Sequence, residues 1–206
     1  MYVPLHFVQD DPMALRALMR DHPLATLIVN ASGGLSADHL PLLFDPGAGP
    51  QGTLHGHVAR ANPLWREADG REVLAIFHGP QGYVSPTWYA SKAEHGKVVP
   101  TWNYAVVHAY GPLRAVDDKT WLRQFVVRLT EVHEGARPAP WSVSDAPADF
   151  VEQLLDAIVG FEIPLTRLVG KWKASQNRPA ADRAGVASGL QQDGHPGAAA
   201  LVRRQR

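Results

Sequence analysis

Short apolar segments separated by turn residues fill the central part of the chain, and this pattern constrains the fold more than any other feature. Residues 24–34 predict a β-branched strand that ends in a Gly-Gly turn, and residues 35–45 predict its return strand. Apolar and polar residues alternate along residues 52–61, which predicts a third strand. Residues 71–80 form the continuous apolar run that is typical of a strand buried on both faces. Together these segments indicate antiparallel hairpins.

Two further strands are expected in the second half. Residues 99–116 predict a long strand with a bulge or bend at Gly111-Pro112, and residues 161–174 predict a last strand that closes the sheet. The regular strand–helix alternation of a doubly wound sheet is missing. Six or seven strands with helices inserted at the edges therefore predict an antiparallel barrel of the α+β class.

Apolar residues at helical spacing predict the helices. The expected helices cover residues 10–23, 62–68, 118–135, 146–160 and 179–191. Asn62 is the expected cap of the second, with Pro63 at its first position, and Asp145 or Ser144 is the expected cap of the fourth. Residues 192–206 are expected to fray.

The length of 206 residues favours one domain with a helical appendage. We expect residues 1–178 to form the main domain, with inserted helices, and residues 179–206 to form a C-terminal helix and flexible tail.

The charge balance argues against a dedicated nucleic-acid binder. Lys and Arg together number 20, as do Asp and Glu, so the formal net charge is +0, whereas phosphate neutralisation needs a basic excess. Cysteine is absent, which excludes disulfides and thiolate chemistry and fits a reducing compartment. The N-terminus has no signal-peptide pattern and no segment is apolar enough to span a bilayer, so a cytoplasmic location is expected.

Two stretches place aromatic residues beside short polar residues just after a proline. Their members are Tyr83, Ser85, Thr87, Trp88 and Tyr89 in the first, and Thr101, Trp102, Asn103 and Tyr104 in the second. A flavin needs this combination, because its ring has apolar faces and a hydrogen-bonding pyrimidine edge. Ordinary core packing with turn residues explains the pattern equally well, and the residues alone leave both interpretations open.

A phosphate would have to be held by side chains, because no glycine-rich phosphate loop is present. The best candidates are His57, Arg60 and Asn62, at the end of a strand and the start of a helix. The planar guanidinium group of Arg60 can donate two hydrogen bonds to a phosphate, and the first backbone amides of the helix also attract anions. The alternative is an exposed arginine beside a plain asparagine cap.

Other chemistries are disfavoured. His39, His55 and His57 lie on neighbouring strands, but no carboxylate accompanies them as in a metal site. Ser85 lacks the G-x-S-x-G context of a hydrolase. A helix-turn-helix is disfavoured because a long proline-rich segment joins the two central helices.

Six segments in order resemble the PaiB-type FMN-binding negative transcriptional regulators. They are "MYVPLHF", "ADHLPLLFD", "LHGHVARANPLW", "VLAIFHGPQGYVSPTWY", "VPTWNYAVVHAYGPL" and "GKWKASQNRPAADRAGVASGL". The resemblance runs from residue 1 to about residue 192. Two mild departures are Thr87, where Ser is usual, and Trp172, where Leu is usual.

The resemblance implies an antiparallel split β-barrel of the pyridoxamine-phosphate-oxidase and flavin-reductase type with peripheral helices. It also implies a homodimer that holds FMN near the subunit interface. The residues that it assigns to FMN are Asp38, His39, Leu40, His57, Arg60, Asn62, Ser85, Trp88, Thr101, Trp102, Asn103, Lys171, Ser175, Gln176 and Asn177.

The implied function is negative transcriptional regulation through flavin occupancy or redox state, with a DNA or protein partner. The balanced charge does not support direct DNA binding. The alternatives are an FMN-dependent oxidoreductase or flavin reductase, and a haem-binding split-barrel protein. No catalytic residue stands out.

Overall fold

The computed structural model describes residues 1–204, which divide into two compact units. The first unit comprises Met1–His22, Phe77–His108 and the residues from Leu168 onward, and the second comprises Pro23–Ile76 and Ala109–Arg167. Each unit buries its own large apolar side chains. Examples are Met19, Phe77 and Leu190 in the first unit, and Leu27, Phe161 and Ile163 in the second.

The described residues form ten strands in two sheets. The six-stranded sheet has the order β1 (Val8–Gln9), β10 (Arg167–Lys173), β7 (Thr101–Pro112), β6 (Glu72–Val84), β2 (Leu24–Ala31) and β3 (Gly34–Pro41). The four-stranded sheet has the order β4 (Leu43–Asp45), β5 (Thr53–Ala59), β9 (Ile158–Pro164) and β8 (Arg114–Val116). The pairs β1–β10, β2–β3, β4–β5, β5–β9 and β8–β9 are all antiparallel. The predicted α+β class with antiparallel sheets is confirmed.

The number of strands is larger than the predicted six or seven, partly because residues 161–174 do not form one closing strand. They contribute to β9 and β10, which belong to different sheets. Between them, the backbone N–H of Leu165 bonds to Gly52 and that of Thr166 bonds to Tyr110. These hydrogen bonds hold the backbone where it leaves one sheet for the other.

The single long strand predicted over residues 99–116 is wrong, because the chain changes sheet just after Gly111-Pro112. β7 ends at Pro112 in the six-stranded sheet and β8 begins at Arg114 in the four-stranded sheet. A Cβ added at Gly111 would overlap the carbonyl oxygen of Pro164. Only glycine permits the two backbones to approach this closely.

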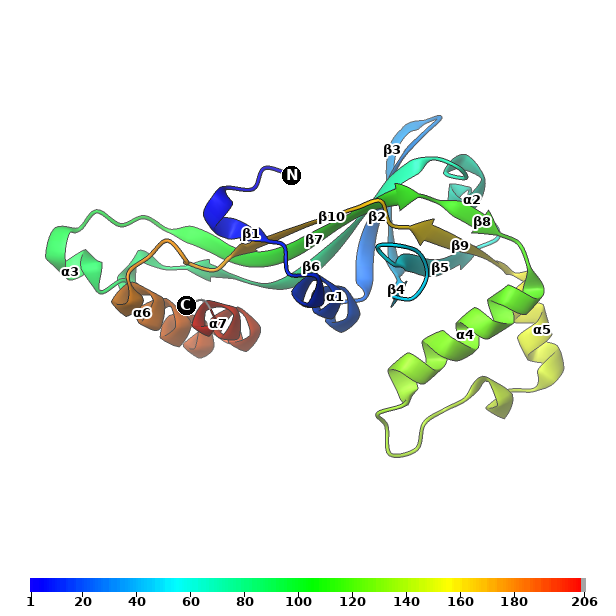
Figure 1. Cartoon of the computed structure of the whole chain (residues 1–206). Helices are drawn as coiled ribbons and strands as arrows, with labels where there is room; N and C mark the ends of the chain where they lie inside the picture. The colour runs from blue at the N-terminus through cyan, green and yellow to red at the C-terminus, as the bar shows by residue number, and fades with distance from the viewer. Residues whose placement is uncertain (205–206) are drawn as a thin grey trace. The chain divides into compact units, whose positions relative to one another are not determined.

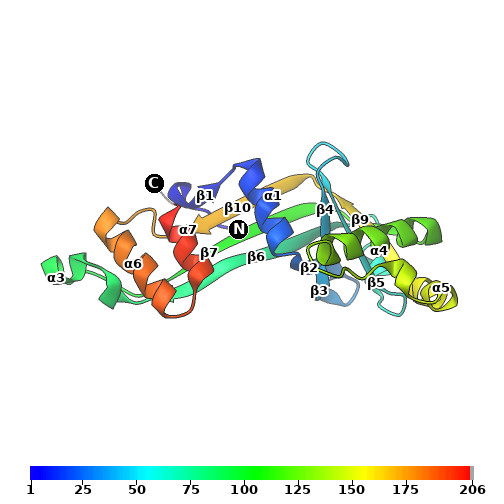
Figure 2. The same cartoon turned by 90° about the horizontal axis from the view of Figure 1, so that it is seen from below.

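In the first unit, the helices of residues 12–21, 180–192 and 196–203 lie on one face of β6, β7 and β10, as Figures 1 and 2 both show. The α-helices are α1 (Pro12–Asp21), α3 (Ser91–His95), α6 (Ala180–Gln192) and α7 (Pro196–Arg203), and the 3-10 helices are η1 (Leu5–Phe7) and η2 (Pro86–Trp88). The prediction of α1 is confirmed. Asp11 caps it by accepting the N–H of Met13, and Leu15, Leu18 and Met19 form its buried face.

The prediction that the chain frays after residue 192 is wrong for residues 196–203, which form α7. Pro196 starts this helix, and its buried residues are Ala198, Ala199, Leu201 and Val202. Small side chains let α7 pack closely beside α6 (Figure 2). Residues 205 and 206 of the expected tail lie outside the described residues, and the domain boundary after residue 178 stays a prediction.

The helices of the second unit are α2 (Leu64–Glu67), α4 (Lys119–Glu134), α5 (Ala148–Asp156) and the 3-10 helix η3 (Val143–Asp145). α4 and α5 lie side by side (Figure 1). Leu122 of α4 and Val151 and Leu155 of α5 form a buried apolar cluster. The predicted cap of α5 is wrong. Asp145 forms a capping box with Ser142 around η3, while α5 starts after Pro147.

Candidate functional site

The predicted site residues fall into two groups, one in each unit. The first unit contains Ser85, Trp88, Thr101, Trp102, Asn103, Lys171, Ser175, Gln176 and Asn177. The second contains Asp38, His39, Leu40, His57, Arg60 and Asn62.

In the first unit, the start of β7 lies beside the segment that follows β10. The Asn103 amide donates to Ser175 Oγ at 2.9 Å, and Lys173 Nζ donates to Thr101 Oγ1. Asn103 is 1% exposed, and its Oδ1 is buried without a hydrogen-bond partner among the described residues. The structure therefore brings three predicted residues together, and it adds Lys173, which sequence reasoning missed. Its position two residues after Lys171, on the same face of a strand, was the available signal.

Ser175 lies in a tight turn and has a φ of 61°. Its neighbour Gln176 closes this turn, because its side chain accepts the N–H of Ala174 at 2.7 Å and donates to the carbonyl of Trp172. A left-handed backbone at a residue other than glycine costs of order 1–3 kcal/mol and is concentrated at functional sites. Asn177 follows as an exposed residue.

The opposite side of β7 carries exposed aromatic rings, because successive strand residues point to opposite faces. Trp102 is 47% exposed and Tyr83 is 44% exposed, and their rings meet edge to face at 6.2 Å. The indole N–H of Trp102 donates to Gln81 at 3.1 Å. Lys171 Nζ lies 5.4 Å from the ring of Tyr104 and donates to the carbonyl of Tyr2. We call Tyr83, Trp102, Tyr104 and Lys171 the aromatic face.

The other aromatic residues singled out in the sequence belong to the core. Tyr89 is 3% exposed, and Trp88 lies against α6, where Gly189 leaves room for its indole and Gly185 for its backbone carbonyl. Ser85 caps η2 and its hydroxyl bonds to that of Thr87 at 2.7 Å. Turn capping and packing therefore account for this stretch, apart from Tyr83.

In the second unit, the predicted residues Asp38 and Asn62 are joined directly. The Asn62 amide donates to Asp38 Oδ1 at 2.8 Å, while its oxygen accepts the N–H of Leu64. The predicted cap is displaced by one residue, because α2 starts at Leu64 and Pro63 is its cap residue. His39 Nδ1 lies 3.2 Å from the hydroxyl of Thr26, and Leu40 is half-buried on the same strand.

Arg60 is bound by groups of its own chain. Its two terminal nitrogens donate to the two carboxylate oxygens of Asp117 at 2.8 and 2.7 Å, and Nε donates to the carbonyl of Asp156 at 2.7 Å. The hydrogen bonds from Arg60 lower the pKa of Asp117. A phosphate at this arginine would have to compete with Asp117.

His57 faces α4. Its ring meets Phe125 edge to face at 5.8 Å, and Nδ1 is buried without a hydrogen-bond partner among the described residues. Burial lowers the pKa of His57. Within residues 1–204, no group of three or more His, Asp or Glu side chains is arranged to hold a metal ion.

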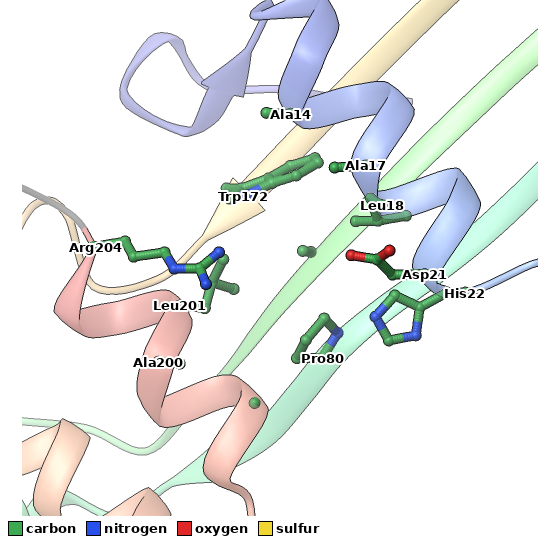
Figure 3. A pocket seen from close by; sticks show the side chains of 12 residues that line it. Ala14, Ala17, Leu18, Asp21, His22, Pro80, Trp172, Ala200, Leu201 and Arg204 are labelled. Atoms are coloured by element: carbon green, nitrogen blue, oxygen red, sulfur yellow. The ribbon is translucent and has the colours of Figure 1, made fainter. Parts of the chain in front are cut away.

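A cavity of about 290 Å³ lies in the first unit between α1, α7 and the sheet. Leu18, Pro80 and Trp172 are among the residues that line it. Figure 3 shows Arg204 reaching in from α7 and Asp21 from α1 on opposite sides. A second cavity of about 290 Å³ lies in the second unit, between β5 and α4. Neither of these two cavities is lined by a residue predicted to bind FMN.

None of the described helices is long and apolar enough to span a membrane.

Comparison with solved structures defines the fold class. The fold is shared with the flavocytochrome Anf3 of Azotobacter vinelandii, at a TM-score of 0.62 and 13% identity, with 89% of this chain and 78% of that chain covered. The protein thus has the α+β split-barrel fold found in flavin-binding proteins.

Sequence comparison then gives the family. Residues 1–167 match the family model described as "Putative FMN-binding domain". The protease synthase and sporulation protein PAI 2 of Bacillus subtilis is 31% identical, with 96% of this chain and 93% of that protein covered. An uncharacterized protein of Emericella nidulans is 36% identical, with 86% and 85% covered. The chain belongs to the PaiB-type family of FMN-binding proteins, and FMN is its cofactor.

The residues present fit FMN in their chemistry. The aromatic face offers apolar surface for the isoalloxazine ring. The cations near the predicted residues are Lys171 and Lys173 in the first unit and Arg60 in the second.

Proposed function

We propose that the isoalloxazine ring of FMN packs on the aromatic face of the first unit. The observation that carries this proposal is the exposure of Trp102 and Tyr83, at 47% and 44%, with their rings in edge-to-face contact. An adjoining pair of half-exposed aromatic side chains is a surface that a flat ligand or a second protein covers. The hydrogen bond from Trp102 to Gln81 fixes the indole, so less side-chain entropy is lost when the flavin binds.

The other predicted residues of the first unit complete the proposed site. Thr101, Asn103, Ser175, Gln176 and Asn177 supply hydrogen bonds near the start of β7, with Ser85 and Trp88 from η2. The contacts of Asp38, His39, Leu40, His57, Arg60 and Asn62 with FMN, all in the second unit, stay a separate prediction. FMN, when bound, supplies one- or two-electron redox chemistry, while these side chains bind and orient it.

We further propose that the protein is a homodimer in which a second copy covers the aromatic face. Asn103 and Trp102 point to opposite faces of β7, so a single flat ligand does not lie against both side chains of one chain. A second copy of the chain would provide the second surface against which the flavin ring packs. Sedimentation analysis of the FMN-loaded protein should give twice the chain mass of 22.5 kDa. Substitution Tyr83→Glu should shift this equilibrium toward the monomer, and a monomer at all concentrations for the unsubstituted chain contradicts the dimer.

The proposed biological role is negative regulation of transcription, in which flavin occupancy or redox state changes the affinity for a protein or DNA partner. The likeness to the sporulation protein PAI 2 over almost the whole of both chains supports this role. A cytoplasmic location is part of the proposal. The formal net charge of +0 favours a protein partner over direct contact with DNA.

The binding proposal is tested with two matched tryptophan variants. Trp102 is 47% exposed in the first unit and Trp141 is 48% exposed in the second. Trp102→Ala should weaken FMN binding by about tenfold or more, as expected for loss of a stacking contact. Trp141→Ala should leave the affinity unchanged. Equal effects of the two substitutions on FMN affinity contradict the aromatic face as the flavin site.

The regulatory proposal is tested in a strain that lacks this protein. Transcripts that rise in the deletion strain should fall again with the unsubstituted chain or Trp141→Ala, but not with Trp102→Ala. If no transcript changes, and the purified protein instead oxidises NADH or NADPH steadily, the protein is an FMN-dependent oxidoreductase.

A further inference from the structure

The second unit contains a cavity that no proposed FMN contact uses. It has a volume of about 290 Å³ and is lined by His55 of β5 and by Trp121, Gln124, Phe125 and Arg128 of α4. The four helix residues follow the spacing i, i+3, i+4 and i+7, so one face of α4 forms one wall. This volume lies at the lower limit of ligand pockets, roughly 300 Å³ and upward, and suits a molecule with a single ring.

Two of the side chains that line this cavity have buried polar atoms without partners. His55 is 6% exposed, and neither of its ring nitrogens has a hydrogen-bond partner among the described residues. Nε of Arg128 is likewise buried without a partner, although its Nη1 donates to Asp45 at 3.1 Å. Buried polar groups are normally hydrogen-bonded, so two unpartnered groups at one cavity point to a missing polar ligand.

The cavity also has flat apolar walls. The rings of His55 and Trp121 are stacked with centroids 5.8 Å apart and an interplanar angle of 21°. Trp121 and Phe125 are stacked at 5.2 Å and 13°. The indole N–H of Trp121 donates to Glu162 at 3.0 Å, which fixes the orientation of this ring. Aromatic side chains in the lining favour a ligand with an aromatic body, because rings also pack edge to face.

We propose that this cavity binds a small aromatic monocarboxylate, whose carboxylate accepts hydrogen bonds from Nε of Arg128 and from the ring of His55. Arginine and histidine N–H groups are the donors that a carboxylate prefers. The site goes beyond the proposed FMN function and is independent of it.

The charges around His55 link this binding to proton uptake. Glu162 of β9 lies 3.7 Å from His55 Nδ1, Asp45 of β4 and Arg128 of α4 also face it, and His57 lies two residues along the same strand. Burial, followed by the charge of Arg128, lowers the pKa of His55, so its ring is neutral at pH 7 without a ligand. A carboxylate at Nε2 adds a negative charge, and a protonated ring then donates to the ligand and faces Glu162. Affinity should therefore rise as the pH falls.

The test is calorimetric titration of the full chain, with and without saturating FMN, using benzoate and its neutral analogue benzamide as probes. We expect benzoate to bind more tightly than benzamide, and by about tenfold more tightly at pH 6 than at pH 8, with proton uptake measured in buffers of different ionisation enthalpy. Saturation with FMN should leave benzoate binding unchanged.

Two arginine variants on α4 form a matched pair. Arg128→Lys keeps the positive charge near Asp45 but removes the Nε–H donor, and it should weaken benzoate binding by about tenfold or more. Arg123→Lys alters an arginine that pairs with Glu152 of α5, so it should leave benzoate binding unchanged. Gln124→Trp should fill the cavity and abolish binding while the protein stays folded, as judged by circular dichroism.

Three results would overturn the proposal. They are no benzoate binding at millimolar concentration, equal affinity for benzoate and benzamide, or equal effects of the two lysine substitutions. Competition between benzoate and FMN would assign the carboxylate to the flavin site and would also overturn it.

Discussion

Arg60 illustrates how one residue serves distant parts of the second unit. Besides Asp117 and the carbonyl of Asp156, its Nη2 reaches the carbonyl of Ile158 at 3.1 Å. The sequence predicted that the Arg60 guanidinium binds a phosphate. In the structure it binds the carboxylate of Asp117, 57 residues further along the chain. The sequence around Arg60 identifies the donor but not its acceptor. The acceptor is far away in sequence and is brought close only when the strands pair.

Competition between Asp117 and the FMN phosphate can be measured with two ligands. Arg60→Ala should weaken FMN binding more than riboflavin binding, because only FMN carries the phosphate dianion. Asp117→Asn should strengthen FMN binding and leave riboflavin binding unchanged, because it reduces the competing negative charge. Equal losses for both ligands in Arg60→Ala would mean that Arg60 serves only the fold.

The half-buried His57 should make stability depend on pH. Burial lowers its pKa from the ordinary 6.5, so the unfolded chain binds a proton more readily than the folded chain. The stability that the neutral ring contributes is therefore complete above pH 6.5 and is lost as the pH falls toward the lowered pKa. The free energy of unfolding of His57→Phe, from urea titrations, should fall less between pH 7 and pH 5 than that of the unsubstituted chain. Identical slopes would contradict this assignment.

The contact between α6 and η2 depends on two glycines one helical turn apart. A Cβ at Gly185 would overlap the carbonyl oxygen of Trp88, and a Cβ at Gly189 would overlap its indole ring. Glycine normally weakens a helix by about 1 kcal/mol relative to alanine. Here the close approach of η2 outweighs that propensity.

Substitution of Gly185 tests this packing through the sign of the effect. Gly185→Ala should lower the free energy of unfolding by about 1–3 kcal/mol, because backbone atoms cannot move aside as a flexible side chain does. The exposed Ser188→Ala on the same helix should change it little. Thermal and urea denaturation give both values, and a stabilised Gly185→Ala protein would contradict the packing described.

Elements were predictable from sequence where local signals agree. The hairpin β2–β3 and the helix α1 have turn, cap and periodicity signals that all coincide. α7 was missed because glycine and proline at its start suggested a tail, whereas burial of its alanines against the rest of the first unit decides the outcome. The separation of β9 from β10 was missed because the hydrogen bonds of Leu165 and Thr166 are made to residues far away in sequence.

At the scale of the whole molecule, the sequence identified the family and the cofactor, but it did not identify which aromatic residues remain at the surface. The structure divides the aromatic and polar stretches into a buried part around Trp88 and Tyr89 and an exposed part around Tyr83 and Trp102. The buried part packs against α6, where glycines leave room for Trp88. The exposed part is therefore the place where we propose that the flavin binds.

The most direct test of this account is titration of the flavin-free protein with FMN, followed by tryptophan fluorescence and thermal unfolding. We predict saturable quenching, and a melting temperature that rises with FMN concentration because the ligand binds only the folded state. In Trp102→Ala both effects should be much weaker. A protein that shows neither quenching nor a thermal shift at saturating FMN would contradict the account.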